Sequence, residues 1–277
     1  MADENREISP FCLLPEDCIE KIVSFTSPRD ACKAVAVSPV FKSVVESDTV
    51  WERFLPPDYK EILSRSCSSV KFSTMKELYV LLSESLLLDE GKMSFRLSRS
   101  TGKKCYMLSA RELDIAWKDS LTYRKWNSLP ESRFGEVANL YKVYWLEISG
   151  RFQVKMLSPN TNYAAYFVFK FSKLHHELDC SSKASVKFLD DCTNEIGGDV
   201  GHTVYIDPLA DELEMERNIN ARVPCSRIDG WLELELGEFL VAEGDNREVE
   251  AKLSETEILY RKGGLIVEGI EVRPKES

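Results

Sequence analysis

The sequence lacks the features that mark metal sites, basic nucleic-acid-binding domains and membrane spans. Its eight cysteines form no Cys-x-x-Cys pair and there are only three histidines, so we expect no metal site and no other cofactor. The net charge of −10 disfavours nucleic acid as a partner, because phosphate binding needs clustered lysine and arginine. No stretch approaches about eighteen consecutive apolar residues, so we expect no transmembrane helix.

Further absences bear on compartment and catalysis. The N-terminal segment has mixed charges and no apolar core, which is not typical of a secretory signal. This segment and the cysteine spacing together indicate a reducing compartment, either the cytosol or the nucleus or both. Neither a Gly-x-Ser-x-Gly nor a Cys-His nucleophile signature is present, and no glycine-rich loop could hold phosphate. We therefore expect a protein that is not an enzyme.

Helix signals dominate the first ninety or so of the 277 residues. Apolar residues recur at helical spacing from Leu14 to Val23, and Pro15 suits a first helical position. Ser27-Pro28 and Ser38-Pro39 each combine an N-cap with a proline at the next position, which predicts two more helices. Asp48 is predicted to cap a last short helix before Pro56-Pro57 ends it.

These helices are predicted to form a docking module over residues 7–55. Fewer than about fifty residues cannot bury all of their apolar side chains within one small domain. Apolar surface that is left over is usually covered by a partner protein. The candidate partner-binding residues are Leu14, Pro15, Ile19, Ile22, Val23, Trp51 and Phe54.

Residues 56–92 are predicted to be a helical linker. Thr74 and Glu77 have capping-box spacing, and leucines follow on one face of a helix expected to extend from Leu78 to Leu88. From about residue 93 the apolar period falls to two, as in Leu232, Leu234 and Leu236. Residues 93–277 are therefore predicted to form a β-sandwich of the jelly-roll kind. The fold class is a small helical domain and a helical linker, followed by an all-β domain.

Several strands of this sandwich can be placed from the sequence. The aromatic run 163–171 suits a buried central strand. Alternation of Phe152, Val154 and Met156 with polar residues predicts another strand. Trp145 and Trp231 lie in strand patterns and are expected in the core.

Two sets of residues in the sandwich invite a binding or catalytic interpretation. Trp117 and Trp126 flank a polar segment, which favours a concave aromatic site over burial by a small margin. Glutamates at close spacing resemble the paired carboxylates of glycosidases. We expect them instead to occupy the solvent-facing side of amphipathic strands; they are Glu233, Glu235, Glu268 and Glu271.

The first segment resembles an F-box. The resemblance rests on residues 14–17 (Leu-Pro-Glu-Asp), on the Ile19, Ile22 and Val23 face, and on residues 34–38 and 50–54 (Val-Trp-Glu-Arg-Phe). An F-box implies docking onto a Skp-type adaptor and, through it, onto a cullin of a ubiquitin ligase. The seven candidate partner-binding residues of the docking module are the ones expected to make that contact.

Residues from about 105 to 274 resemble the phloem-lectin (Nictaba-like) domain of plants. The resemblance rests on the segments 105–113, 116–117, 158–166, 227–233 and 262–270 in this order. It implies a lectin-like domain that selects target proteins, with carbohydrate on glycoproteins as the usual ligand. The residues it implies for carbohydrate binding are Trp117, Tyr123, Arg124 and Trp126.

One of these positions departs from the family pattern. The family often has Tyr-Trp-x-Trp in this loop, whereas this chain has Arg124 at the second position. A guanidinium is planar but is not equivalent to an indole against a sugar ring, and it can bind a carboxylate or a phosphate. The departure implies either a shift toward acidic groups or a loss of glycan binding.

The sequence leaves several functions open. The main hypothesis is the substrate-recognition subunit of a Skp-cullin-F-box ubiquitin ligase that acts on a target protein, glycosylated or not. The alternatives are a lectin with a vestigial F-box, an F-box adaptor that reads protein rather than glycan, and a glycoside-active enzyme as the weakest.

Overall fold

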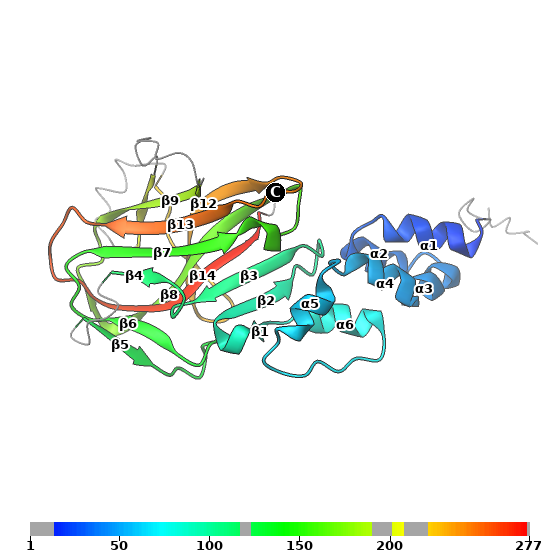
Figure 1. The fold of residues 1–277 in the computed structure, drawn as a ribbon, viewed down its shortest axis with the longest axis horizontal. Helices are drawn as coiled ribbons and strands as arrows, with labels where there is room; N and C mark the ends of the chain where they lie inside the picture. Colours follow the sequence, from blue (N-terminus) through cyan, green and yellow to red (C-terminus); the bar gives the residue numbers. More distant parts are fainter. Residues whose placement is uncertain (1–13, 117–122, 190–200, 208–220, 276–277) are drawn as a thin grey trace, which may run out of the picture. The chain divides into compact units, whose positions relative to one another are not determined.

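The computed structural model describes residues 14–116, 123–189, 201–207 and 221–275 (Figure 1). It divides into two compact units. The helical unit contains the chain up to Glu84 together with Arg96–Lys103, and the sandwich unit contains Ser85–Phe95 and the chain from Lys104 onward. Among the described helices, none combines the length and the apolar character needed to cross a membrane.

Three of the short helices of the helical unit begin after a serine N-cap. The Oγ atom of Ser27 accepts a hydrogen bond from the amide of Asp30 at 3.1 Å, and that of Ser38 accepts one from Phe41 at 3.4 Å, which confirms both predicted caps. The Asp48 cap is wrong, because Ser47 occupies that position. The helices are α1 (Glu16–Ser24), α2 (Pro28–Ala34), α3 (Pro39–Glu46), α4 (Asp48–Phe54), α5 (Tyr59–Ser64) and α6 (Met75–Leu82).

Asp48 instead links α4 to α6 through a hydrogen bond. Its Oδ1 atom accepts a hydrogen bond from the amide of Met75 at 2.7 Å, and Met75 is the first residue of α6. Thr74 caps α6 by accepting from the amide of Glu77 at 3.1 Å, as predicted. Two backbone amides at the start of α6 thus donate to side-chain oxygens, one on the adjoining Thr74 and one on Asp48 of α4.

The predicted extension of α6 to Leu88 is wrong. The helix ends at Leu82, and the Oγ atom of the next residue, Ser83, donates to the carbonyl of Tyr79 at 2.8 Å. Leu86–Leu88 form strand β1, which pairs antiparallel with β2 (Met93–Leu97). Helix propensity of the leucines is overridden here by a strand partner.

The sandwich consists of two sheets whose named strands pair antiparallel throughout the described chain. The first sheet has the order β1, β2, β3 (Lys104–Ser109), β14 (Gly263–Pro274), β8 (Thr161–His176), β12 (Leu232–Val241) and β11 (Cys225–Ser226), with β5 (Arg124–Asn127) joined through β6 (Val137–Leu140) to β14. The second has the order β10 (His202–Tyr205), β9 (Ser181–Leu189), β13 (Glu248–Glu255), β7 (Leu146–Gln153) and β4 (Asp114–Ile115).

Register assigns each face of the first sheet. Phe167 of β8 lies opposite Ile270 of β14, which lies opposite Leu108 of β3, so these three side chains share one face. A Cβ atom added to Gly150 of β7 would lie 3.3 Å from both Ile270 and Leu108, so this face packs on the second sheet. The aromatic run predicted as a central strand is confirmed, since β8 lies between β14 and β12.

The strand predicted to continue through Met156 is wrong. β7 ends at Gln153, and Val154–Met156 form a short 3-10 turn, although Val154 itself is buried. Short 3-10 turns are common as connectors between regular elements. The expected burial of Trp231 is confirmed, whereas Trp145 lies just before β7 and is partly exposed.

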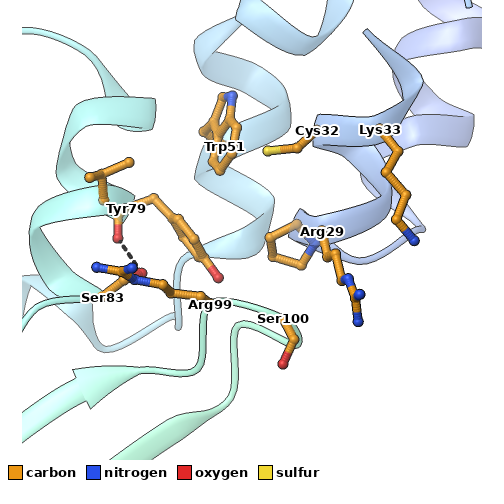
Figure 2. Close-up of a pocket in the computed structure, with 10 residues that line it drawn as sticks. Arg29, Cys32, Lys33, Trp51, Tyr79, Ser83, Arg99 and Ser100 are labelled. Atoms are coloured by element: carbon orange, nitrogen blue, oxygen red, sulfur yellow. Dashed lines mark hydrogen bonds between the residues drawn. The ribbon is translucent and has the colours of Figure 1, made fainter. Parts of the chain in front are cut away.

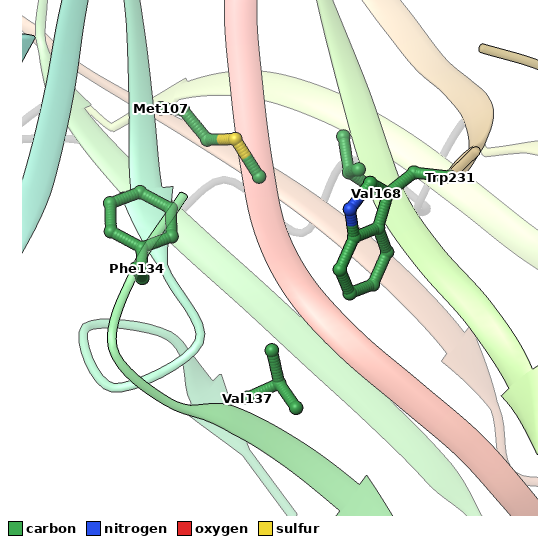
Figure 3. Close-up of a cluster of buried hydrophobic side chains, with 5 residues drawn as sticks. All are labelled: Met107, Phe134, Val137, Val168 and Trp231. Atoms are coloured by element: carbon green, nitrogen blue, oxygen red, sulfur yellow. The ribbon is translucent and has the colours of Figure 1, made fainter. Parts of the chain in front are cut away.

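The outward face of the first sheet has its own apolar cluster. Figure 3 shows Met107 of β3, Val168 of β8 and Trp231 lying over one patch of the sheet, with Phe134 and Val137 beside them. All five are buried. The segment that leads into β6 therefore covers part of the outward face, and Trp231 belongs to this cluster rather than to the core between the sheets.

Two motifs of the sandwich have structural roles. Tyr163 is buried, and its hydroxyl donates to the carbonyl of Lys104 at 2.8 Å and accepts from the amide of Ser158 at 3.0 Å. Burial raises the pKa of this hydroxyl to about 12. Gly269 allows two backbones to touch, because a Cβ atom there would lie 1.9 Å from the carbonyl oxygen of Leu108.

Candidate functional site

The helical unit exposes large apolar side chains on and around α1. Leu14 is 37% exposed, Ile22 is 45% exposed and Phe25, which follows α1, is 73% exposed. Val37 and Val40 are also exposed, at the connection from α2 to α3 and at the start of α3. We call these five residues the exposed apolar set. α1 packs against α3, so the set is carried by neighbouring helices.

The predicted partner-binding residues divide into two groups. Leu14, Pro15 and Ile22 are exposed, in agreement with a docking role. The other four are buried and hold the unit together: Ile19, Val23, Trp51 and Phe54. Phe25, Val37 and Val40 are exposed as well but are not among the predicted residues. Phe25 could have been found from its spacing, since it lies three residues after Ile22 and shares its face.

Trp51 is the centre of the helical core. Its indole Nε1 donates to the carbonyl of Val45 at 2.6 Å. Its ring centroid lies 5.7 Å from that of Phe54 and 5.2 Å from that of Tyr79. A side chain with this packing fixes α4 against α6 and is not available to a partner.

The predicted carbohydrate-binding residues are only partly brought together. Trp117 lies outside the described residues. Arg124 is buried in β5, and its guanidinium carbon lies 4.3 Å from the ring centroid of Trp126. The guanidinium of Arg111 lies over the same ring at 4.0 Å and forms an ion pair with Glu136. Tyr123 contacts Tyr144 edge to face, with 6.4 Å between centroids.

Trp126 is therefore occupied by cations within the chain itself. Cation–π contacts at these distances favour a guanidinium over the ring face. Beside Arg111 lies a polar cavity of about 310 Å³, whose lining includes Lys92, Ser109, Glu112 and Glu136. This cavity is lined by charged and hydroxyl groups that can hydrogen-bond a polar ligand.

The four glutamates do not all lie on a solvated strand face as expected. Glu271 is 1% exposed, and its Oε2 accepts from Arg227 at 2.8 Å and from Arg273 at 3.0 Å. Glu233 accepts from the same two arginines, at 2.8 Å from Arg227 and 2.6 Å from Arg273. The guanidinium of Arg273 also lies 3.6 Å from the ring centroid of Tyr166. We call Arg227, Glu233, Glu271 and Arg273 the charge network.

The expectation of a solvent-facing glutamate fails for Glu271 because the guanidinium groups of Arg227 and Arg273 allow its carboxylate to be buried. Glu235 is also paired, with Arg222 at 3.1 Å and with Lys275. Glu268 is buried, its Oε1 accepts from the amide of Arg133 at 3.0 Å, and burial raises its pKa. Carboxylates held by two guanidinium groups have a structural explanation that does not require glycoside hydrolysis.

A second buried ion pair lies where β13 leads into β14. Lys262 is 1% exposed, forms an ion pair with Glu255 at 2.5 Å and donates to the carbonyl of Tyr144 at 3.1 Å. It also donates to the carbonyl of Ile258. The same segment exposes Leu259 and Tyr260. A buried ammonium group thus fixes a loop that presents apolar side chains.

Comparison with known proteins agrees with the two units. A family model described as F-box domain matches residues 11–53, and one described as Phloem protein 2 matches residues 103–274. Two similar relatives, both from Arabidopsis thaliana, are 43% identical to this chain. They are F-box protein PP2-B10 (272 residues aligned, 97% of this chain and 95% of the relative) and F-box protein At2g02240 (276 residues aligned, 97% and 82%).

Among solved structures, a family 35 carbohydrate binding module from Clostridium thermocellum matches with 10% identity and a TM-score of 0.34, over 62% of this chain and 98% of that one. A GH26-CBM35 β-(1,4)-mannanase from Podospora anserina matches with 7% identity and a TM-score of 0.35, over 62% and 28%.

The chain belongs to the plant F-box proteins that carry a phloem protein 2 domain. Its F-box implies binding to a Skp-type adaptor and, through it, to a cullin. F-box proteins generally serve as non-catalytic adaptors of such ligases. The organisation of this chain, an F-box followed by a lectin-like domain, is consistent with a substrate adaptor.

Proposed function

We propose that this protein is the substrate-recognition subunit of a Skp-cullin-F-box ubiquitin ligase, and that its sandwich selects the target protein. The observation that carries the proposal is the exposed apolar set of the helical unit. Apolar surface of this kind on a small helical unit marks a protein-binding face. The chain itself makes and breaks no bond; it raises the effective concentration of the target near the ubiquitin-charged enzyme.

The docking contact is made by the exposed members of the predicted set, with Leu14, Pro15 and Ile22 joined by Phe25, Val37 and Val40. Each fully buried aliphatic side chain contributes about 1.5–3 kcal/mol. Several such residues across one interface offset the cost of association. The four buried residues act indirectly, by holding α1, α3 and α4 in place.

The test is co-purification of the full-length chain with a Skp-type adaptor. The double variant Leu14→Ala/Pro15→Ala is expected to lose adaptor binding. It is also expected to keep the β-sheet signal in the circular dichroism spectrum of the full-length chain. Leu240→Ala, an exposed leucine of β12, is the matched control and is expected to bind normally. Undiminished capture of the adaptor by the double variant would contradict the proposal.

The ligand of the sandwich is a glycan carried by the target protein, bound at the segment from Trp117 to Trp126. The partly exposed Trp126 and the neighbouring polar cavity support this assignment. Glycan-array binding by the purified chain is the test. Trp126→Ala and Trp117→Ala are expected to remove the signal, and the absence of any glycan signal from the unmodified chain would count against it.

A second candidate is recognition of a protein surface without sugar. The observation that favours it is the pair of guanidinium groups over Trp126, which leaves less of the ring for a pyranose. Capture of targets from plant cells under proteasome inhibition separates the two. Targets that remain bound after enzymatic deglycosylation support protein recognition.

The protein acts in the cytosol, the nucleus or both. The support is the composition of the chain, whose six described cysteines are free thiols. A fluorescent fusion expressed at native level, imaged together with a Skp-type adaptor, is expected to show both proteins in the same compartment. Accumulation of the fusion in the secretory pathway would contradict it.

A further inference from the structure

The helical unit contains a cavity of about 810 Å³ whose lining includes none of the exposed apolar set. The cavity lies between α2, α6, Trp51 of α4 and the turn at residues 98–102 after β2, which we call the hairpin tip. All of these segments belong to the same compact unit. Its apolar lining includes Pro28, Trp51, Tyr79 and Val80. This volume is within the usual range for small-molecule sites, which is about 300–1,000 Å³.

The charged groups of this lining all have one sign. Arg29, Lys33 and Arg99 line the cavity, and no aspartate or glutamate of the described residues does. This is notable in a chain whose net charge is −10. Cations gathered at an apolar cavity attract an anion that also has an apolar body.

Two of these cations already have carboxylate neighbours, but the pairs are exposed. Lys33 lies 3.1 Å from Asp30, and Arg99 pairs with Glu84. All four side chains are more than half exposed, so each pair contributes little free energy. A ligand anion at the cavity can therefore compete for both cations.

The wall of the cavity is well defined. The hydroxyl of Tyr79 donates to the carbonyl of Ser98 at 3.0 Å, which holds the hairpin tip against α6. Gly102 of this tip has φ +70°, and a Cβ atom there would lie 3.3 Å from the carbonyl oxygen of Phe54. Glycine thus lets the hairpin approach the helices closely.

Figure 2 shows how the functional groups are arranged. The sulfur of Cys32 is turned toward Trp51, while Arg29 and Lys33 extend from the same helix and Arg99 comes from the hairpin side. The cations therefore come from two separate segments of the chain.

We infer that this cavity binds a small amphipathic carboxylate, with its flat apolar body against Pro28, Tyr79 and Val80 and its carboxylate at the cationic rim to which Arg29, Lys33 and Arg99 belong. Such a ligand contacts α2 and α6 at once. The site is independent of target recognition by the sandwich, and its test does not depend on the adaptor.

The test uses two probes with the same ring system, 2-naphthoate and the uncharged 2-naphthylmethanol, titrated into the purified full-length chain by calorimetry. Naphthoate is expected to bind saturably below about 1 mM and at least about tenfold more tightly than the alcohol. Arg29→Gln/Arg99→Gln is expected to remove this difference. Lys71→Gln, an exposed lysine outside the lining, is expected to leave it unchanged.

Two further readouts locate the bound probe. Val80 is an exposed residue of the lining, so Val80→Trp can fill the cavity without disturbing the core and is expected to abolish binding of both probes. Naphthoate is also expected to slow alkylation of Cys32 by iodoacetamide but not that of Cys67, which is exposed elsewhere. Equal affinity for the two probes, or binding that survives both the double variant and Val80→Trp, overturns the inference.

Discussion

Both units leave large apolar side chains in solvent, but among the described residues the sandwich alone also buries charged side chains. The helical unit leaves Leu14, Ile22 and Phe25 in solvent. The sandwich takes Glu271 and Lys262 almost completely out of solvent. Exposed apolar groups gain from a partner, whereas buried charges need partners that are already present.

The difference shows where each unit obtains its specificity. A small helical unit cannot enclose all of its apolar surface, which leaves part of that surface for the proposed adaptor to cover. The larger sandwich has enough core to bury charged groups, and some of its buried ion pairs join segments far apart in sequence. Arg227 and Glu271, for example, connect the segment before β12 to β14.

The largest expected effect is the loss of a buried charge from the sandwich. Glu271→Ala leaves Arg227 and Arg273 close together with one acid fewer, which is expected to lower the free energy of unfolding by about 3–5 kcal/mol. Urea unfolding followed by tryptophan fluorescence measures it. Glu257→Ala, an exposed position before β14, is the control, and an effect no larger than the control would show that the network does not stabilise the sheet.

Two adjacent residues of α1 sharpen the comparison within the helical unit. Val23 is buried, so Val23→Ala is expected to lower the free energy of unfolding by about 2 kcal/mol. Ile22 is exposed, so Ile22→Ala is expected to change it by less than about 0.5 kcal/mol.

Adaptor binding is the second property in which Ile22 and Val23 are compared. Ile22→Ala is expected to weaken binding by about tenfold, because its exposed side chain belongs to the proposed docking surface. Val23→Ala is expected to weaken binding only as far as it unfolds the helix. The reverse assignment, with Ile22 governing stability and Val23 governing binding, would break the comparison.

A smaller effect is expected from the hydrogen bond between α6 and the hairpin tip. Tyr79→Phe removes the donor to the carbonyl of Ser98, which is expected to lower the free energy of unfolding by about 1 kcal/mol. Differential scanning calorimetry of the full chain measures it. Tyr260→Phe removes a hydroxyl from an exposed ring and should leave the transition in place; equal shifts for both variants would show that this hydrogen bond does not contribute.

The smallest effect concerns the pH dependence of the sandwich. Burial raises the pKa of Glu268 in the folded state, so the folded chain loses stability as pH rises from the unfolded value near about 4.3 through the folded one. Glu268→Gln is expected to be more stable than the unmodified chain at neutral pH, with the difference shrinking toward pH 4. Urea midpoints at several pH values measure it, with Glu257→Gln as the control; a difference independent of pH would contradict the assignment.

The sequence predicts local structure well where one residue determines it. The serine caps at Ser27 and Ser38 are found at their predicted positions because a cap needs only the residues that follow it. The alternation of Leu232, Leu234 and Leu236 places these residues in a strand for the same reason.

Features that depend on a distant partner could not be predicted in this way. Leu86–Leu88 are a strand because β2 pairs with them. Glu271 is buried because Arg227 and Arg273 neutralise it. The guanidinium of Arg111 lies over the ring of Trp126, and the sequence spacing of these two residues does not predict the contact. Of the predicted docking residues, the helical period identified the apolar ones but not which face the other helices cover.

The burial of Lys262 has a consequence for the proposed ligase role. A ubiquitin ligase brings an electrophilic thioester close to many amines, and lysines of the recognition subunit are among them. Lys262 uses its ammonium group to hold Glu255 and two carbonyl groups, so it cannot act as a nucleophile while the sandwich is closed. Labelling of this lysine by an acylating reagent would therefore report opening of the sandwich.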